Sequence, residues 1–300
     1  MRNVRKASLC LLYCFVRGTL SPSFTPCKED NIPLDPRTCA CGAFLYFFKV
    51  NAVAVAYKYA KIDFSDIIGY NKTIIIRGRM ELTYRIIDKN KYYRSGVYRH
   101  FTQDCKCSLS VTARLDVTEL AGYSRRNNTR FYINFLYILS KVLNSRDDYK
   151  MGYIWETDEL ICYDVINPTH YVLHEENETC TPVYSRYYEN YEDFYRSALE
   201  DIETAKQTRG YGLDSANHPN WFDASYISWL SYDSMNIELP DGYLYFLPII
   251  NWGKYREENG RLMMPLTVRL NHAIADGFLA ANVFRLLEKE MERFCNNIRI

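Results

Sequence analysis

The feature that most constrains the fold is a β-strand pattern that runs directly into a helix pattern near the C-terminal end. Residues 261–271 alternate in polarity, so one face of the expected strand is apolar. Residues 278–295 repeat apolar side chains at helical spacing on a charged background. The apolar strand positions are Leu266, Val268 and Leu270, and His272 continues their face. A long strand therefore leads through a short turn into an amphipathic helix.

The chain from Met80 onward continues this alternation of strands and helices. Period-two patterns and apolar runs predict strands at residues 107–117, 153–154, 160–163, 179–183, 229–238 and 243–251. Helical spacing predicts helices at residues 131–143 and 190–208. Residues 157–159 read as the turn of a hairpin. The sequence therefore predicts one α/β domain over residues 80–300.

Composition excludes several classes of protein. The chain has 300 residues, of which 48% are hydrophobic and 24% charged, with a net charge of +1. This charge gives no sign of a surface that coats phosphates, so we expect no nucleic-acid partner. The mean hydropathy of −0.31 and the lack of a clean apolar run of about 20 residues argue against a membrane protein.

The first 79 residues differ in composition from the rest. They hold 12 Lys and Arg against 5 Asp and Glu, together with 5 of the 10 cysteines. Residues 1–16 have the outline of a signal peptide, but Arg17 follows at once and no small-residue cleavage site appears. We therefore expect residues 1–79 to be an extraneous or disordered extension; a secretory leader is the alternative. The domain itself is expected to be cytoplasmic.

The turn between the last strand and the last helix carries the chemistry. His272 leaves the strand on its apolar side, and Asp276-Gly277 starts the helix. A neutral histidine in this position can act as a general base toward a hydroxyl group. The spacing alone slightly favours a core histidine next to an aspartate that only caps the turn.

The stretch His272-Ala-Ile-Ala-Asp276-Gly277 resembles the H-x-x-x-D-G signature of the chloramphenicol acetyltransferase family. Further segments resemble the family in the same order: Arg94 with Tyr98-Arg-His, Ser108–Asp116, Asp158-Glu-Leu-Ile, Trp229…Ser234-Met-Asn236, Gly253-Lys-Tyr255 and Met264-Pro-Leu266. The resemblance covers about 215 residues. It implies a two-layer α/β sandwich around a mixed sheet, the CoA-dependent acyltransferase fold, assembled as a homotrimer with active sites between subunits.

The resemblance also assigns roles to four residues. His272 is expected to be the catalytic base that takes the proton of the chloramphenicol 3-hydroxyl, which attacks acetyl-CoA directly. Ser234 is expected to donate a hydrogen bond to the oxyanion. Asp276 is expected to pair with Arg94 and to support the site structurally. Acetyl-CoA is the implied cosubstrate.

The substrate pockets are also read from the resemblance. The acceptor pocket is implied to involve Phe101, Cys105, Leu109, Leu173, Ile249 and Asn251. Lys254 and Tyr255 are implied to face CoA, although a solvated surface lysine fits Lys254 equally well. The sequence departs from the family pattern at four positions, Asn271, Leu279, Phe101 and Asn251, so the acetyl-transfer machinery looks intact while the acceptor site has changed.

No metal site is expected. Cys105-Lys-Cys107 has no second pair at ligand spacing, and His174 lacks a partner histidine. Two alternatives to a chloramphenicol acetyltransferase remain open: an acyltransferase of the same fold with another acceptor, such as the dihydrolipoyl acyltransferase domain, and a non-catalytic relative that binds a ligand.

Overall fold

The computed structural model describes residues 71–75, 81–208, 218–239 and 244–297. All of these belong to one unit, residues 69–300. The predicted extension 1–79 lies outside the described residues except for residues 71–75. These five residues form a strand, β1 (Asn71–Ile75), which pairs antiparallel with β2 (Glu81–Ile87).

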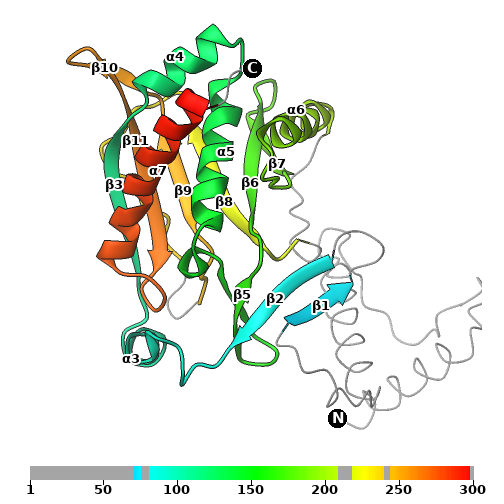
Figure 1. Cartoon of the computed structure of the whole chain (residues 1–300), viewed down its shortest axis with the longest axis vertical. Helices are drawn as coiled ribbons and strands as arrows, with labels where there is room; N and C mark the ends of the chain where they lie inside the picture. The colour runs from blue at the N-terminus through cyan, green and yellow to red at the C-terminus, as the bar shows by residue number, and fades with distance from the viewer. Residues whose placement is uncertain (1–70, 76–80, 209–217, 240–243, 298–300) are drawn as a thin grey trace, which may run out of the picture. The chain divides into compact units, whose positions relative to one another are not determined.

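The main sheet has seven strands and is mixed (Figure 1). In chain order the strands are β3 (Ser108–Asp116), β6 (Asn167–His174), β7 (Thr179–Tyr184), β8 (Trp221–Ile227), β9 (Ile249–Gly253), β10 (Arg256–Glu258) and β11 (Arg261–Asn271). β8 runs parallel to β6 and β9, and the other pairs are antiparallel. The mixed sheet expected from the sequence is therefore present.

Strand β11 is paired along both edges. Residues 263–271 pair with β3 on one side; on the other, residues 266–269 pair with β9 and residues 261–263 with β10. The side chains of Leu266, Val268 and Leu270 are 0% exposed. The predicted alternation is thus confirmed, with the apolar positions facing the core.

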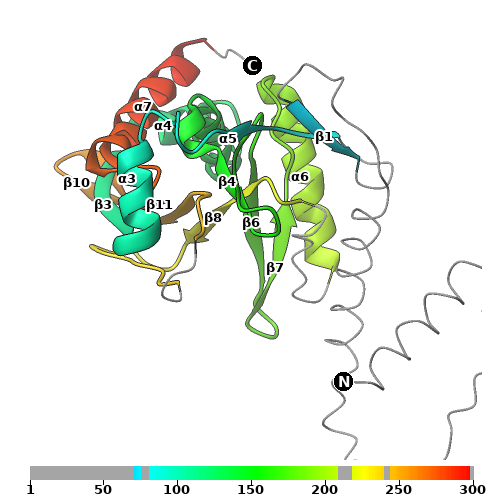
Figure 2. The same ribbon diagram turned by 90° about the horizontal axis from the view of Figure 1, so that it is seen from below.

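Four helices form a layer on one side of this sheet, as Figure 2 shows. They are α4 (Thr118–Arg126), α5 (Phe131–Asn144), α6 (Tyr191–Gln207) and α7 (Gly277–Asn297). α7 packs on β3 and β11, and α6 packs on β6 and β7. One layer of helices on one mixed sheet is the two-layer α/β fold that the sequence predicts.

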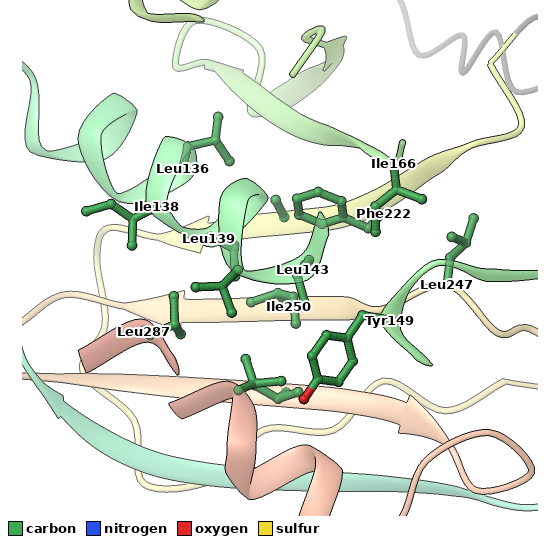
Figure 3. Packing of buried hydrophobic residues seen from close by; sticks show 14 of the residues in the cluster. Leu136, Ile138, Leu139, Leu143, Tyr149, Ile166, Phe222, Leu247, Ile250 and Leu287 are labelled. Atoms are coloured by element: carbon green, nitrogen blue, oxygen red, sulfur yellow. The ribbon is translucent and has the colours of Figure 1, made fainter. Parts of the chain in front are cut away.

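The core lies between these helices and the sheet. α5 carries the largest share of it, because ten of its residues are buried and it contacts α4, α6 and α7 as well as β6. Figure 3 shows Leu139 and Leu143 of α5 close to Ile250 of β9 and Phe222 of β8. Trp252 is fully buried in the same layer. Burial on this scale is the main favourable contribution to folding.

A second, antiparallel sheet has the order β1-β2-β5-β4. β4 (Met151–Ile154) and β5 (Glu159–Tyr163) form the predicted hairpin. Asp158 in its turn has φ of 56°, a left-handed conformation that Asp tolerates better than most residues. The chain then crosses from β2 to the main sheet through α3 (Ser95–Arg99) and a π-helical turn, η1 (His100–Asp104).

Two strand predictions were wrong in position. Residues 229–238 form no strand; the strand lies earlier, at β8, and Trp229 and Leu230 are exposed. This segment crosses a face of the sheet instead of joining it. The Tyr232 hydroxyl, for example, donates to the Asn251 carbonyl oxygen at 2.7 Å. The strand predicted at 243–251 begins only at Ile249, and residue 243 lies outside the described residues.

Gly253, the last residue of β9, allows the crossing segment to lie close. A Cβ atom there would meet the Leu230 carbonyl oxygen at 2.5 Å and Pro265 Cγ at 2.9 Å. We expect Gly253→Ala to lower the free energy of unfolding by about 1–3 kcal/mol, because backbone atoms must move to admit the methyl group. Urea unfolding followed by circular dichroism measures this.

Gly96→Ala is the matched control, since nothing lies within 4 Å of the position that its Cβ atom would take. Because Gly96 lies in α3, alanine there should raise the free energy of unfolding slightly, by about 0.5–1 kcal/mol, and should not lower it. Equal stability of both variants would contradict the close approach at Gly253.

Candidate active site

The turn after β11 is built by backbone and side-chain hydrogen bonds around Asn271. Its side-chain oxygen accepts from the Ala273 N–H at 2.9 Å, and its carbonyl oxygen accepts from the Ala275 N–H at 3.0 Å. The next residue, His272, donates its own N–H to the Cys107 carbonyl oxygen at 3.1 Å. The position of His272 is therefore fixed from β11 and from the start of β3.

The imidazole of His272 is held by stacking. Its ring lies 3.9 Å from the ring of Phe101, centroid to centroid, with an interplanar angle of 12°. The Nδ1 atom is buried and has no hydrogen-bond partner among the described residues. Because no carboxylate in the described chain bonds this ring, its plane is set by Phe101 and by the backbone turn.

Asp276 makes a different set of contacts. Its Oδ2 accepts from Arg94 Nη2 at 2.8 Å, and its Oδ1 accepts from the Leu279 N–H at 3.1 Å, which caps α7. The hydrogen bond from Arg94 lowers the pKa of Asp276 below its usual value, and the backbone donors at the start of α7 add to the effect. Asp276 is thus an ionised structural carboxylate.

The ion pair connects the two segments that flank the imidazole. Arg94 directly precedes α3, which leads into η1 and Phe101, while Asp276 follows the turn that holds His272. The Arg94 side chain is only 13% exposed. The pairing predicted from the sequence is present, and it ties the stacking partner of His272 to the histidine's own turn.

Ser234 lies in the segment between β8 and β9 and is exposed. Two residues later, Asn236 accepts a hydrogen bond from Ser110 of β3 at 2.6 Å. Within the part of the chain that the structure describes, no hydrogen bond joins Ser234 to His272. One copy of the chain does not bring the predicted oxyanion donor onto the predicted base.

The predicted acceptor residues fall into two groups. Phe101, Cys105 and Leu109 lie on η1 and early β3, beside His272; Leu109 is opposite Leu270. The second group lies on other strands of the main sheet: Ile249 and Asn251 on β9, and Leu173 on β6 opposite Cys180. No described contact joins the second group to the imidazole.

Ile249 and Asn251 are opposite Arg269 and Thr267 of β11, so they lie on the face of the sheet away from the helices. This face is called the open face below. They are 6% and 1% exposed. The Oδ1 atom of Asn251 is buried without a hydrogen-bond partner in the described chain. This face therefore has polar groups that are withdrawn from water and only partly satisfied.

The predicted CoA residues follow β9. Lys254 is exposed, and its N–H donates to the Leu230 carbonyl oxygen at 2.9 Å. The ring of Tyr255 meets Phe131 edge-on at 5.2 Å. Leu279, one of the departures from the family pattern, is 2% exposed in the first turn of α7 and so belongs to the core.

Sequence reasoning missed a buried and a half-buried charged residue on the same open face. Arg269 is 6% exposed, donates to Ser108 Oγ at 2.9 Å, and its pKa is lowered by burial. Asp223 on β8 accepts from the Tyr171 hydroxyl at 2.6 Å, and burial raises its pKa. For Arg269 the sequence carried a signal, because the polar residues Thr267, Arg269 and Asn271 alternate with the apolar residues of β11.

Among the described residues, no cluster of three or more His, Cys, Asp or Glu could hold a metal ion. In the same part of the chain, no helix is long and apolar enough to cross a membrane.

A mixed sheet covered by helices on one face, with a histidine directly after a strand that is paired along both edges and an Asp-capped helix after it, is the arrangement of the CoA-dependent acyltransferase fold. Residues 82–288 match the family model described as chloramphenicol acetyltransferase. The chain is 30% identical over 216 residues to a chloramphenicol acetyltransferase of Proteus mirabilis, covering 70% of this chain and 94% of that protein. It is 26% identical over 208 residues to one from Clostridium butyricum, covering 69% and 94%. The chain belongs to the chloramphenicol acetyltransferase family and is an acetyltransferase.

Solved structures agree on the fold. A chloramphenicol acetyltransferase structure aligns with a TM-score of 0.65 at 18% identity, covering 69% of this chain and 99% of that one. The cubic core of a pyruvate dehydrogenase multienzyme complex aligns with a TM-score of 0.50 at 15% identity, covering 65% and 86%. At these identities the likeness supports the fold alone.

The Arg94–Asp276 pair can be tested by a double-mutant cycle with Asp276→Asn and Arg94→Gln. Asparagine also caps helices, so Asp276→Asn removes the charge and keeps a capping group. Because Asp276 is 40% exposed, we expect a single replacement to cost between the roughly 1 kcal/mol of an exposed pair and the roughly 3–5 kcal/mol of a buried one. The double variant should cost at least about 0.5 kcal/mol less than the sum of the singles.

The pH dependence of this cost follows from the lowered pKa of Asp276. The stabilisation is fully present above the unfolded-state pKa of about 3.9 and is lost as the pH falls through the lower native pKa. Urea unfolding between neutral and acidic pH checks both points. Strict additivity at neutral pH would show that the two residues do not interact.

Proposed function

We propose that this chain O-acetylates the 3-hydroxyl of chloramphenicol, using acetyl-CoA, with His272 as general base. The observation that carries the proposal is the placement of His272: its ring stacks on Phe101 directly after β11, while Asp276 is engaged by Arg94. The imidazole is therefore available to a substrate hydroxyl. The names of the relatives supply the substrate.

The reaction needs one general base, which takes up a proton and returns it, and no covalent enzyme intermediate. The imidazole takes the hydroxyl proton while the oxygen attacks the thioester carbonyl carbon of acetyl-CoA. The carbon–sulfur bond then breaks, and the departing sulfur takes the proton back from the imidazolium. Ser234 is proposed to donate to the tetrahedral oxygen, a contact typically worth about 3–4 kcal/mol.

We also propose that the active form is a homotrimer in which a second copy completes each site. The support is geometric: Ser234, Ile249 and Asn251 make no described contact with His272 of the same chain. A neighbouring copy that covers the open face of the sheet would bring a second set of these groups to the base. A cytoplasmic location, where acetyl-CoA is supplied, fits this proposal.

A different acceptor is the second candidate, and Asn251 is the observation that favours it. Its buried Oδ1 atom lacks a partner among the described residues, which leaves an acceptor for a hydrogen-bond donor where the family resemblance leads us to expect threonine. Thiol release from acetyl-CoA with chloramphenicol, compared with other hydroxyl acceptors, decides between the two. Release with chloramphenicol no faster than hydrolysis alone would favour another acceptor.

We expect His272→Ala to lower kcat by at least about 10²-fold without a loss of stability. The substitution removes the imidazole that acts as the base and leaves the backbone of the turn in place. The measurement is thiol release under saturating acetyl-CoA and acceptor. His218→Gln is the matched control, because the His218 ring stacks at 3.9 Å on Tyr184 of β7 and takes no part in the proposed reaction. An unchanged kcat in His272→Ala would refute the proposed mechanism.

We expect Ser234→Ala to lower kcat by about 10²-fold with a smaller effect on KM, since an oxyanion contact strengthens in the transition state. Ser231→Ala, three residues earlier on the same segment, is the control. A change in KM alone would mean that Ser234 binds substrate and does not stabilise the oxyanion.

A further inference from the structure

Two thiols lie beside the proposed base. Cys105 is exposed and Cys107 is half-buried. The two side chains are near enough for Cys105 to act on the Cys107 thiol, and only the exposed residue Lys106 separates them in the chain. Since the described residues offer no third metal ligand at this place, the pair stands as an isolated dithiol.

The backbone allows these thiols to become a disulfide. Residues two apart in a fully extended strand have Cα atoms about 6.6 Å apart, inside the range of about 4.4–6.8 Å for disulfides. Oxidation therefore needs no large movement of the chain.

Each cysteine contacts one of the supports of the imidazole. The Cys105 N–H donates to the His100 carbonyl oxygen at 3.0 Å and closes η1, which carries Phe101. The Cys107 carbonyl oxygen accepts from the His272 N–H. A covalent link between the thiols would strain both supports together.

We propose that Cys105 and Cys107 form a modification site for low-molecular-weight disulfides such as glutathione disulfide, and that their oxidation to an intramolecular disulfide disturbs the setting of His272. Cys105 thiolate attacks the reagent and releases one thiol. Cys107 thiolate then attacks the sulfur of Cys105 and releases the second. Overall the two cysteines lose two protons and two electrons, and the reagent takes up both and is reduced to two thiols.

The order of the two steps follows from the surroundings. Cys105 is the exposed thiol, so it meets the reagent first. Burial, together with the neighbouring Cys105, raises the pKa of the Cys107 thiol, so Cys107 is the less reactive thiol toward the reagent and attacks second, within the molecule.

The sequence provides a sharp test, because trypsin cleaves between the two cysteines at Lys106. The full-length chain is treated with glutathione disulfide, blocked with iodoacetamide and digested without reduction. We expect peptides 100–106 and 107–114 to appear as one disulfide-linked species, from protein that runs as a single chain on a non-reducing gel. The linked species should be absent in Cys105→Ser and Cys107→Ser and retained in Cys162→Ser, whose thiol is buried on β5.

Two readouts test the effect on the site. Amide hydrogen exchange at His272 should increase in the oxidised chain, since its acceptor at Cys107 moves. Acetyl transfer should fall about tenfold, as a small misplacement of a catalytic group does, and recover with dithiothreitol. The exchange and peptide measurements need no activity, so they hold even if the proposed reaction fails. Separately alkylated or glutathionylated peptides, with no linked species, would overturn the proposal; so would a linked species with unchanged exchange at His272.

Discussion

Double pairing of β11 fixes the turn that carries His272 and Asp276. With β3 along one edge and β9 and β10 along the other, the strand cannot slip in register without turning its apolar side chains toward the open face. α7 follows after a five-residue turn and packs back on β3 and β11. The turn is thereby held at both ends, and His272 is held in place by the paired strand that precedes it.

Support for His272 is divided between an aromatic ring and an ion pair. Phe101 sets the plane of the imidazole, while Arg94 holds Asp276 and so holds the two flanking segments together. A carboxylate engaged in this way is not free to bond the imidazole. The arrangement leaves the Nδ1 atom buried without a described partner, and the dithiol of Cys105 and Cys107 lies where the two supports meet.

The open face of the main sheet is chemically unlike the helix-covered face. Arg269, Asp223 and Asn251 are largely withdrawn from water there, and a buried charge or amide is costly unless it finds partners. The segment with Tyr232 covers part of this face. The remaining polar groups are consistent with a proposed neighbouring copy and a polar acceptor meeting there.

The α/β class, the strand at 261–271, the helix after it and the place of His272 in the turn between them could be predicted from the sequence. Local periodicity and a short motif carry that information. The sequence also predicted the partner of Asp276, through the resemblance of Arg94. The tertiary structure alone decided that residues 229–238 cross the sheet, that Phe101 stacks on His272 and that Arg269 is buried. Those outcomes depend on contacts between segments far apart in the chain. A segment of mixed polarity such as 229–238 has the same pattern whether it pairs at an edge or lies across a face, and only packing distinguishes the two.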